Sequence, residues 1–152
     1  ESLYGNINSS NLAYFHDFIT ELEEKEAIEQ YEEEWAMVPE EQLDIVVLGV
    51  GADGHFASIF PGYLEQSQKQ YDEGKIAIST RTEEFEIKER LTLTAELIKK
   101  AKNILIVIKG KEKLNVLEEI INGEKNAEEF PIKFLLNKNL SEIQTIRIFY
   151  CD

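Results

Sequence analysis

Residues 43–62 read LDIVVLGVGADGHFASIFPG, and this stretch decides the fold that we expect. It begins with an apolar, β-branched run at 45–48, which is typical of a strand buried on both faces in a parallel sheet. Glycines then interrupt the run, with an acidic residue and a histidine on either side of the last one. Because open α/β sheets bind ligands at the carboxyl ends of their strands, this break is the predicted functional site.

Asp53 and His55 are the candidate catalytic residues at this break. Histidine can take up a proton near neutral pH, and a neighbouring carboxylate can orient its ring. Ser58 lacks the flanking glycines of a nucleophile elbow, so the predicted nucleophile is water. The alternative is a simple turn with His55 as a surface residue. The other histidine, His16, is expected to be structural, and two histidines without a cysteine cluster predict no zinc site.

The glycines of this stretch also satisfy the pattern G-x-G-x-x-G, at Gly49, Gly51 and Gly54. That pattern indicates dinucleotide binding when it opens a long helix. Here Asp53 lies inside the pattern, and Pro61 interrupts the helix that should follow. A nicotinamide site is therefore disfavoured, although glycines would let another molecule approach the backbone closely.

The chain has 152 residues, enough for one domain with a sizeable core, and a net charge of −14. This charge disfavours nucleic acids and anionic membranes as partners. The single cysteine, Cys151, excludes an internal disulfide and fits a reducing cytoplasm. The sequence contains no secretory leader and no apolar run long enough to span a bilayer. It starts at Glu1 rather than Met, which leaves open whether a segment upstream was removed.

Strands and helices are predicted to alternate along the rest of the chain. Apolar or alternating runs predict further strands at 75–80, 90–94, 104–108 and 144–150. Helical spacing predicts helices at 10–22, 23–34, 94–101 and 111–122, while 65–74 is a polar stretch and 131–136 a short apolar element. This order favours a single α/β domain over residues 1–152, folded as a three-layer sandwich around a mainly parallel sheet.

Cationic side chains outside the central stretch could hold an anion. Lys113 begins a helix after a second strand–glycine junction, where backbone N–H groups and the helix dipole favour negative charge. Arg81 and Arg90 are further candidates beside predicted strands. The alternatives are a solvated surface lysine and, for Arg90, an ion pair with Glu86 or Glu89.

With these motifs together, the chain resembles the 6-phosphogluconolactonase family, which is similar to glucosamine-6-phosphate deaminase. The resemblance is carried in order by 43–62, by Arg-Leu-Thr-Leu-Thr at 90–94 and by Gly-Lys-Glu-Lys at 110–113. Ser-Asn at 10–11 is similar to the start of an early helix of the family. The resemblance implies a Rossmann-like, cytoplasmic domain that hydrolyses 6-phospho-D-glucono-1,5-lactone in the pentose phosphate pathway, with no metal or organic cofactor.

The resemblance also implies roles for single residues. His55 would be the base that activates water, and Asp53 would orient or support it. The implied substrate-binding residues, which would contribute backbone or positive charge, are Gly49, Gly51, Gly54, Arg90 and Lys113.

Two other functions stay open. Deaminase relatives carry a glutamate just before the proline, where this chain has Phe60, and this difference counts against glucosamine-6-phosphate deamination. A non-catalytic phosphosugar-binding domain of the kind attached to transcription regulators would need a DNA-binding module, and the sequence contains no basic or helix-turn-helix-like segment.

The family also has an amino-terminal part with a Gly-rich phosphate loop, which this chain lacks. An Asp-Glu-Arg of the family falls near Glu1, with Ser2 where the arginine belongs. Residues 1–152 are therefore interpreted as the C-terminal two thirds of the family domain. A missing layer would expose apolar sheet surface, so self-association into a homo-oligomer is a further expectation.

Overall fold

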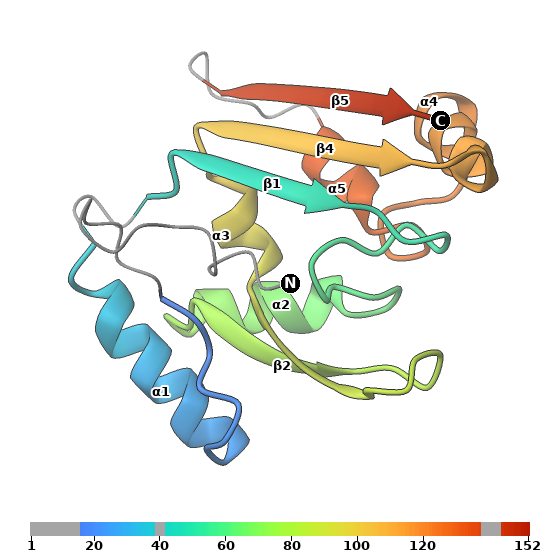
Figure 1. The fold of residues 1–152 in the computed structure, drawn as a ribbon. Coiled ribbons are helices and arrows are strands. Elements are labelled where there is room, and N and C mark those ends of the chain that lie inside the picture. The colour runs from blue at the N-terminus through green and yellow to red at the C-terminus, as the bar shows by residue number, and fades with distance from the viewer. Residues whose placement is uncertain (1–15, 39–41, 138–143) are drawn as a thin grey trace, which may run out of the picture.

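A parallel sheet of three strands organises the structure, a computed structural model that describes residues 16–38, 42–137 and 144–152. Its strands are β1 (Ile45–Gly49), β4 (Asn103–Lys109) and β5 (Thr145–Cys151), in the order β1-β4-β5 (Figure 1). All three run in the same direction, so their carboxyl ends meet at one edge. The predicted Rossmann-like α/β fold with a mainly parallel sheet is confirmed.

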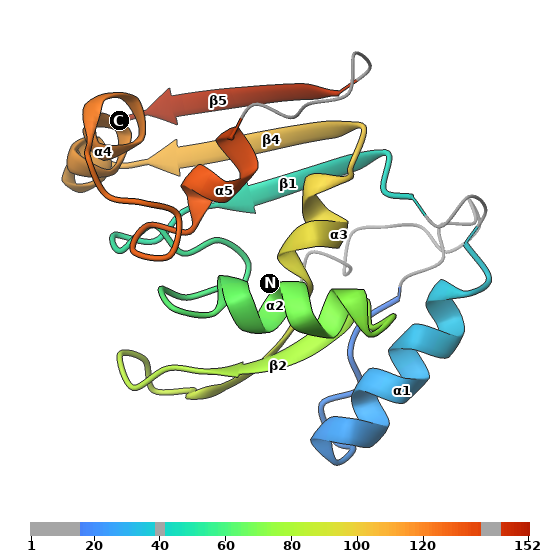
Figure 2. The same cartoon turned by 180° about the vertical axis from the view of Figure 1, so that it is seen from behind.

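Helices cover one face of this sheet. The helices α3 (Ala95–Lys99) and α5 (Ile132–Leu136) lie behind the strands in Figure 1 and in front of them in Figure 2. The helix α4 (Leu114–Asn122) follows a 3-10 turn, η4 (Lys111–Lys113), near the carboxyl end of β4. The side chains that are fully buried in the resulting core include Phe56, Ile59, Ile104, Ile106, Ile108, Phe130, Ile132 and Leu135.

The opposite face of the sheet is open. Ile45 and Val47 of β1 are 61% and 64% exposed, and the strand register places Val107 and Phe149 on the same side. The prediction that the strand at 45–48 is buried on both faces is therefore wrong for the described residues. The reason is that both described helices packed on the sheet, α3 and α5, lie on its other face.

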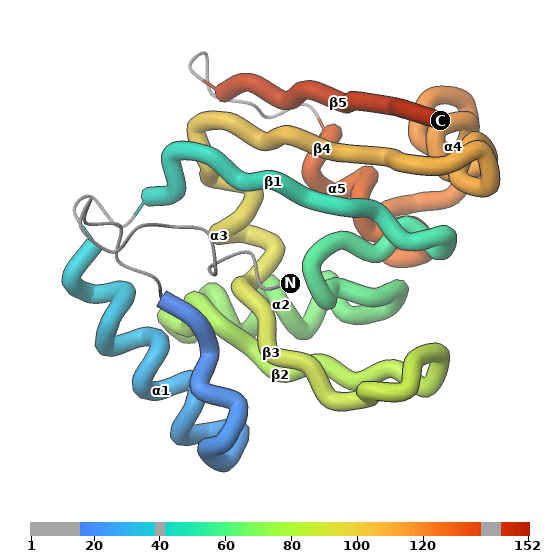
Figure 3. The backbone as a smooth tube through the Cα atoms, in the orientation of Figure 1, coloured from blue at the N-terminus to red at the C-terminus, as the bar shows by residue number. Residues whose placement is uncertain are grey.

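An antiparallel hairpin lies on the far side of the helices from the sheet. It pairs β2 (Ala77–Arg81) with β3 (Glu89–Leu93), and α2 (Leu64–Asp72) lies between this hairpin and the sheet (Figure 3). Both strands were predicted, within two residues of their bounds. The helix α2 was not, because its sequence is almost entirely polar and buries only Leu64 and Ser67.

The predicted helix at 10–22 is wrong where it can be compared. Its first residues, including Ser-Asn at 10–11, lie outside the described residues, and 16–22 contains a turn instead of a helix. The Phe18 ring stacks on Tyr31 at 4.2 Å, which folds this segment back onto α1 (Glu24–Trp35), the helix predicted at 23–34. Within the described ranges, the helices are too short or too polar to cross a bilayer.

Candidate active site

The chain turns sharply after β1 because hydrogen bonds close the following segment on itself. The Gly51 N–H donates to the His55 carbonyl at 2.9 Å, and the Gly54 N–H donates to the Gly51 carbonyl at 3.0 Å. Val50 and Phe56 form an antiparallel bridge, and both side chains are buried. The turn is therefore anchored in the core while its polar residues stand at the carboxyl edge of the sheet.

Asp53 and His55 form a hydrogen-bonded pair in this turn. Asp53 Oδ1 lies 2.6 Å from His55 Nδ1, and it also accepts a bond from the His55 backbone N–H at 3.2 Å. A carboxylate can only accept, so Nδ1 carries the proton and Nε2 has the free lone pair. The side chains are 25% and 18% exposed, so the pair is sheltered and still reachable from solvent. This arrangement has the parts of a general base with its orienting group.

Gly51 makes room for this pair. A Cβ at this position would lie 2.1 Å from His55 Nδ1 and 2.7 Å from Asp53 Oδ1, closer than any real contact of this kind. By contrast, a Cβ on Gly49 would meet no atom within 4 Å. Both glycines line the cleft described below, as expected of residues that present backbone to a ligand.

Gly54 faces the core instead. Its φ of +82° favours glycine, and a Cβ would approach Cγ of the Phe130 ring to 2.5 Å. Its N–H donates to Gly51, and its carbonyl accepts a bond from the Ile132 N–H at 2.9 Å. The structure thus gives Gly54 a clear packing role, and its backbone groups are already engaged.

Two aromatic rings enclose the imidazole of His55. Its ring centroid lies 4.8 Å from that of Phe60 and 5.7 Å from that of Phe85, which meets it edge-on. Phe60 is buried, whereas Phe85, in the loop between β2 and β3, is 41% exposed. The histidine therefore has an apolar setting on two sides, which limits its movement.

A cleft of about 1050 Å³ opens beside this pair, and His55, Asp53 and Phe85 are among the residues that line it. Lys113 also lines it, and Lys113 Nζ donates to the carbonyl of Val50 at 2.5 Å. Among the described lining residues, Lys113 is the one with a cationic side chain. The structure thus brings the predicted base and one predicted anion-binding residue to a single cleft.

Arg90 lies elsewhere. It lines a neighbouring cleft together with Arg81, and its guanidinium carbon is 5.9 Å from the Phe85 ring centroid. Glu89 pairs with Arg81 at 3.3 Å instead of with Arg90, so the alternative ion pair of Arg90 with Glu89 is not seen within the described residues. Arg90 and Lys113 therefore stand in different clefts, with Phe85 next to both.

Sequence reasoning missed the aromatic enclosure and the hairpin that supplies part of it. Phe85 lies in a charged stretch, 81–89, that carried no assignment. The signal that could have found it is the pair of alternating runs on both sides, since two short strands joined by seven residues predict a hairpin. His16 lies apart from this site and pairs with Glu34 at 2.6 Å, as expected of a structural residue.

Comparison with known proteins links this site to one enzyme family. The sequence pattern of "Glucosamine-6-phosphate isomerases/6-phosphogluconolactonase" matches residues 1–145. A probable 6-phosphogluconolactonase of Dictyostelium discoideum is 31% identical over 142 residues, which are 90% of this chain and 58% of that protein. The 6-phosphogluconolactonase of Haemophilus influenzae is 37% identical over 95 residues, 61% of this chain and 38% of that protein.

A solved structure has the same fold. The crystal structure of 6-phosphogluconolactonase from Thermotoga maritima is similar with a TM-score of 0.66 and 29% identity. The similarity covers 86% of this chain and 53% of that chain. The chain thus spans 38% to 58% of the length of these relatives.

Proposed function

Since the chain belongs to the family of glucosamine-6-phosphate isomerases and 6-phosphogluconolactonases, we propose that it hydrolyses 6-phospho-D-glucono-1,5-lactone to 6-phosphogluconate. The observation that carries this proposal is the 2.6 Å pair of His55 and Asp53 in a cleft that also contains Lys113. A hydrolase of this substrate acts in the pentose phosphate pathway. We expect it in the cytoplasm, in keeping with the exposed free thiol of Cys151.

The proposed reaction uses water as the nucleophile. His55 Nε2 accepts a proton from water while the water oxygen bonds to the lactone carbonyl carbon. Asp53 keeps the proton on Nδ1 and stabilises the imidazolium that forms. The ring C–O bond of the tetrahedral intermediate then breaks, and the imidazolium returns its proton to the leaving ring oxygen. The product is the open-chain acid, which ionises.

The oxyanion of this intermediate needs a hydrogen-bond donor, and Lys113 is the candidate. The N–H groups of Gly51, Gly54 and His55 are already engaged within the turn, so they are poorly suited to this role. Lys113 Nζ has two further protons beyond the one donated to Val50. Arg90, one cleft away, is the candidate for the phosphate, because it has no carboxylate partner among the described residues.

A deaminase function is less well supported. Deamination of glucosamine 6-phosphate needs a further acid/base group, and in the deaminase relatives a glutamate precedes the proline. Here that position is Phe60, which is 6% exposed and packs against the His55 ring. An apolar contact thus occupies the position of the missing carboxylate.

The decisive experiment compares two products. We expect the purified chain to accelerate formation of 6-phosphogluconate from the lactone above the uncatalysed rate and to release no ammonia from glucosamine 6-phosphate. Ammonia release would support the deaminase, and phosphosugar binding without turnover of either substrate would support a non-catalytic binding domain. Because the chain spans about half of its relatives, the assay must use this chain itself.

Self-association is part of the same proposal. The open sheet face with Ile45 and Val47 is the candidate contact surface. Sedimentation velocity of the chain, compared with Val47→Lys, measures whether a dimer forms through this face.

A further inference from the structure

We propose that Thr80 and Thr92, one on each strand of the β2–β3 hairpin, position the turn that carries His55. Thr80 Oγ1 donates to the carbonyl of Ser58 at 2.8 Å, and the Ser58 N–H donates to Thr92 Oγ1 at 3.4 Å. Both backbone groups of a residue three positions beyond His55 are thus bonded to side chains of the hairpin.

The burial of these hydroxyls indicates that the bonds are specific. Thr80 is 3% exposed and Thr92 is 5% exposed, so neither hydroxyl can exchange its partner for bulk water. A buried polar group that loses its partner costs more than an exposed one. Apolar side chains of the same shape would fill this space equally well, so packing alone does not explain two threonines here.

The residue before Ser58 explains why this segment needs to be held. Ala57 has a φ of +50°, in the left-handed region that a residue with a Cβ avoids at a cost of about 1–2 kcal/mol. Such a conformation persists only where the surroundings enforce it. The two threonine bonds supply that constraint, together with the buried anchors Phe56 and Ile59 on either side.

The constraint reaches the imidazole along two routes. Phe60, two residues beyond Ser58, contacts the His55 ring at 4.8 Å. Phe85, in the loop that joins the two threonine-bearing strands, contacts the same ring at 5.7 Å. A hairpin that holds the Ser58 backbone and also supplies Phe85 therefore sets the orientation of the ring from both sides.

The test compares variants of matched shape. Thr80→Val removes the hydroxyl and keeps the volume, whereas Thr80→Ser keeps the hydroxyl. Thr94→Val is the control, because Thr94 is also fully buried but caps α3, its Oγ1 accepting from the Leu97 N–H at 3.4 Å. This control loses a buried hydroxyl of the same kind without touching the turn.

The kinetic readout rests on the proposed lactonase function. We expect Thr80→Val to lower kcat by about tenfold, because a small displacement of a catalytic group is costly, with KM changed by less than about twofold. Thr80→Ser should recover most of kcat, and Thr94→Val should lower the melting temperature while keeping kcat. Equal loss of kcat in Thr80→Val and Thr94→Val would overturn the proposal.

A second readout needs no turnover. The chain has two histidines, so the imidazole NMR signals of His16 serve as an internal reference for those of His55. We expect Thr80→Val to weaken the nuclear Overhauser effects from the His55 ring to Phe60 and Phe85 and to leave His16 unchanged. If these effects equal those of the wild-type chain, the positioning role is refuted. If the wild-type chain is inactive, the proposed function fails, and this measurement still decides the positioning role.

Discussion

Two histidine–carboxylate pairs in this molecule have the same short distance and very different surroundings. His55 Nδ1 lies 2.6 Å from Asp53, and His16 Nδ1 lies 2.6 Å from Glu34. In the first pair the side chains are 18% and 25% exposed; in the second they are 41% and 32% exposed. The comparison teaches that pair geometry alone does not make a catalytic base.

The surroundings account for the difference. The His55 ring is enclosed by Phe60 and Phe85 and lines a cleft with Lys113. Neither His16 nor Glu34 lines that cleft, and the exposure of their side chains leaves the pair screened by water, where such contacts contribute little. A carboxylate can orient a histidine for chemistry only where a substrate can also reach the ring.

The largest expected effect separates the two histidines. His55→Ala should lower kcat for lactone hydrolysis by about 10²–10⁴-fold, because the general base is lost. His16→Ala should leave kcat unchanged and lower stability by at most about 1 kcal/mol, as for an exposed pair. Steady-state kinetics and thermal unfolding measure both. Near-normal kcat in His55→Ala would remove the base assignment.

A second test separates the two carboxylates. Asp53→Asn keeps the shape of the side chain, but its amide can force the proton onto the wrong ring nitrogen, so kcat should fall by about 10²-fold. Glu34→Gln makes the matched change in the exposed pair and should have no effect on kcat. Equal kcat in both variants and in the wild-type chain would mean that Asp53 does not orient His55.

The space beside the catalytic pair can be tested with glycines. Gly51→Ala places a methyl group 2.1 Å from the present position of His55 Nδ1, so the ring must move, and kcat should fall by about tenfold or more. Gly49→Ala, also in the cleft but with no neighbour within 4 Å of the new Cβ, should keep the fold and perturb kcat less. A crystal structure of Gly51→Ala with an unmoved imidazole would contradict this reasoning.

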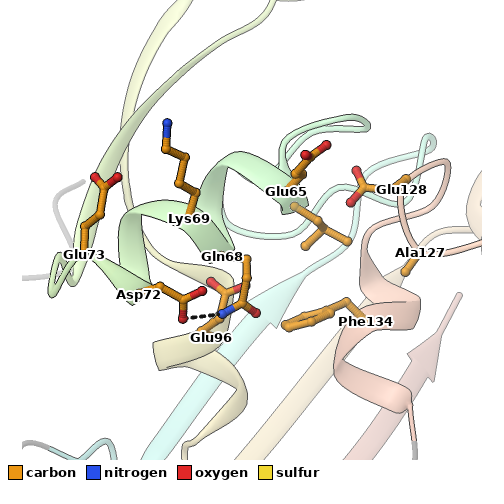
Figure 4. A pocket seen from close by; sticks show the side chains of 10 residues that line it. Glu65, Gln68, Lys69, Asp72, Glu73, Glu96, Ala127, Glu128 and Phe134 are labelled. Carbon is orange, nitrogen blue, oxygen red and sulfur yellow. Dashed lines mark hydrogen bonds between the residues drawn. The ribbon is translucent and has the colours of Figure 1, made fainter.

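A third carboxylate shows the converse case, a buried acid without a base. Glu96 of α3 is 7% exposed and reaches toward α2, beside Gln68 and Asp72, in a cleft of about 710 Å³ (Figure 4). Its Oε2 accepts a bond from Ser67 Oγ at 2.6 Å, and its Oε1 has no partner among the described residues. Burial raises the pKa of Glu96, so this carboxyl resists ionisation, and it links two helices instead of orienting a ring.

The smallest expected effect concerns the stability that this buried acid costs. Because its pKa is raised in the folded state, folding loses stability as the pH rises above the ordinary carboxyl range. Glu96→Gln should therefore stabilise the fold at about pH 7, by about 1 kcal/mol, and the gain should vanish near pH 4, where both states hold the proton. Urea unfolding of both proteins at the two pH values measures this difference. A gain that is independent of pH would exclude ionisation as its cause.

The sequence predicted the centre of this site well, because the relevant signals are local. An apolar run followed by glycines determines both β1 and the turn that presents Asp53 and His55. What was missed depends on contacts between distant segments. Phe85 approaches His55 only because β2 pairs with β3, and α2 has a polar sequence because it packs through so few residues. Neither relationship leaves a periodic signal within a single window.

The uncovered side of the parallel sheet has a practical consequence for measuring all of these variants. Dyes that fluoresce on greasy surfaces should bind the native protein at Val47 and Phe149, so a dye-based melting curve would begin bright and report unfolding poorly. The single tryptophan, Trp35, is 9% exposed and offers a cleaner optical probe, since its emission should shift to the red only when α1 comes apart.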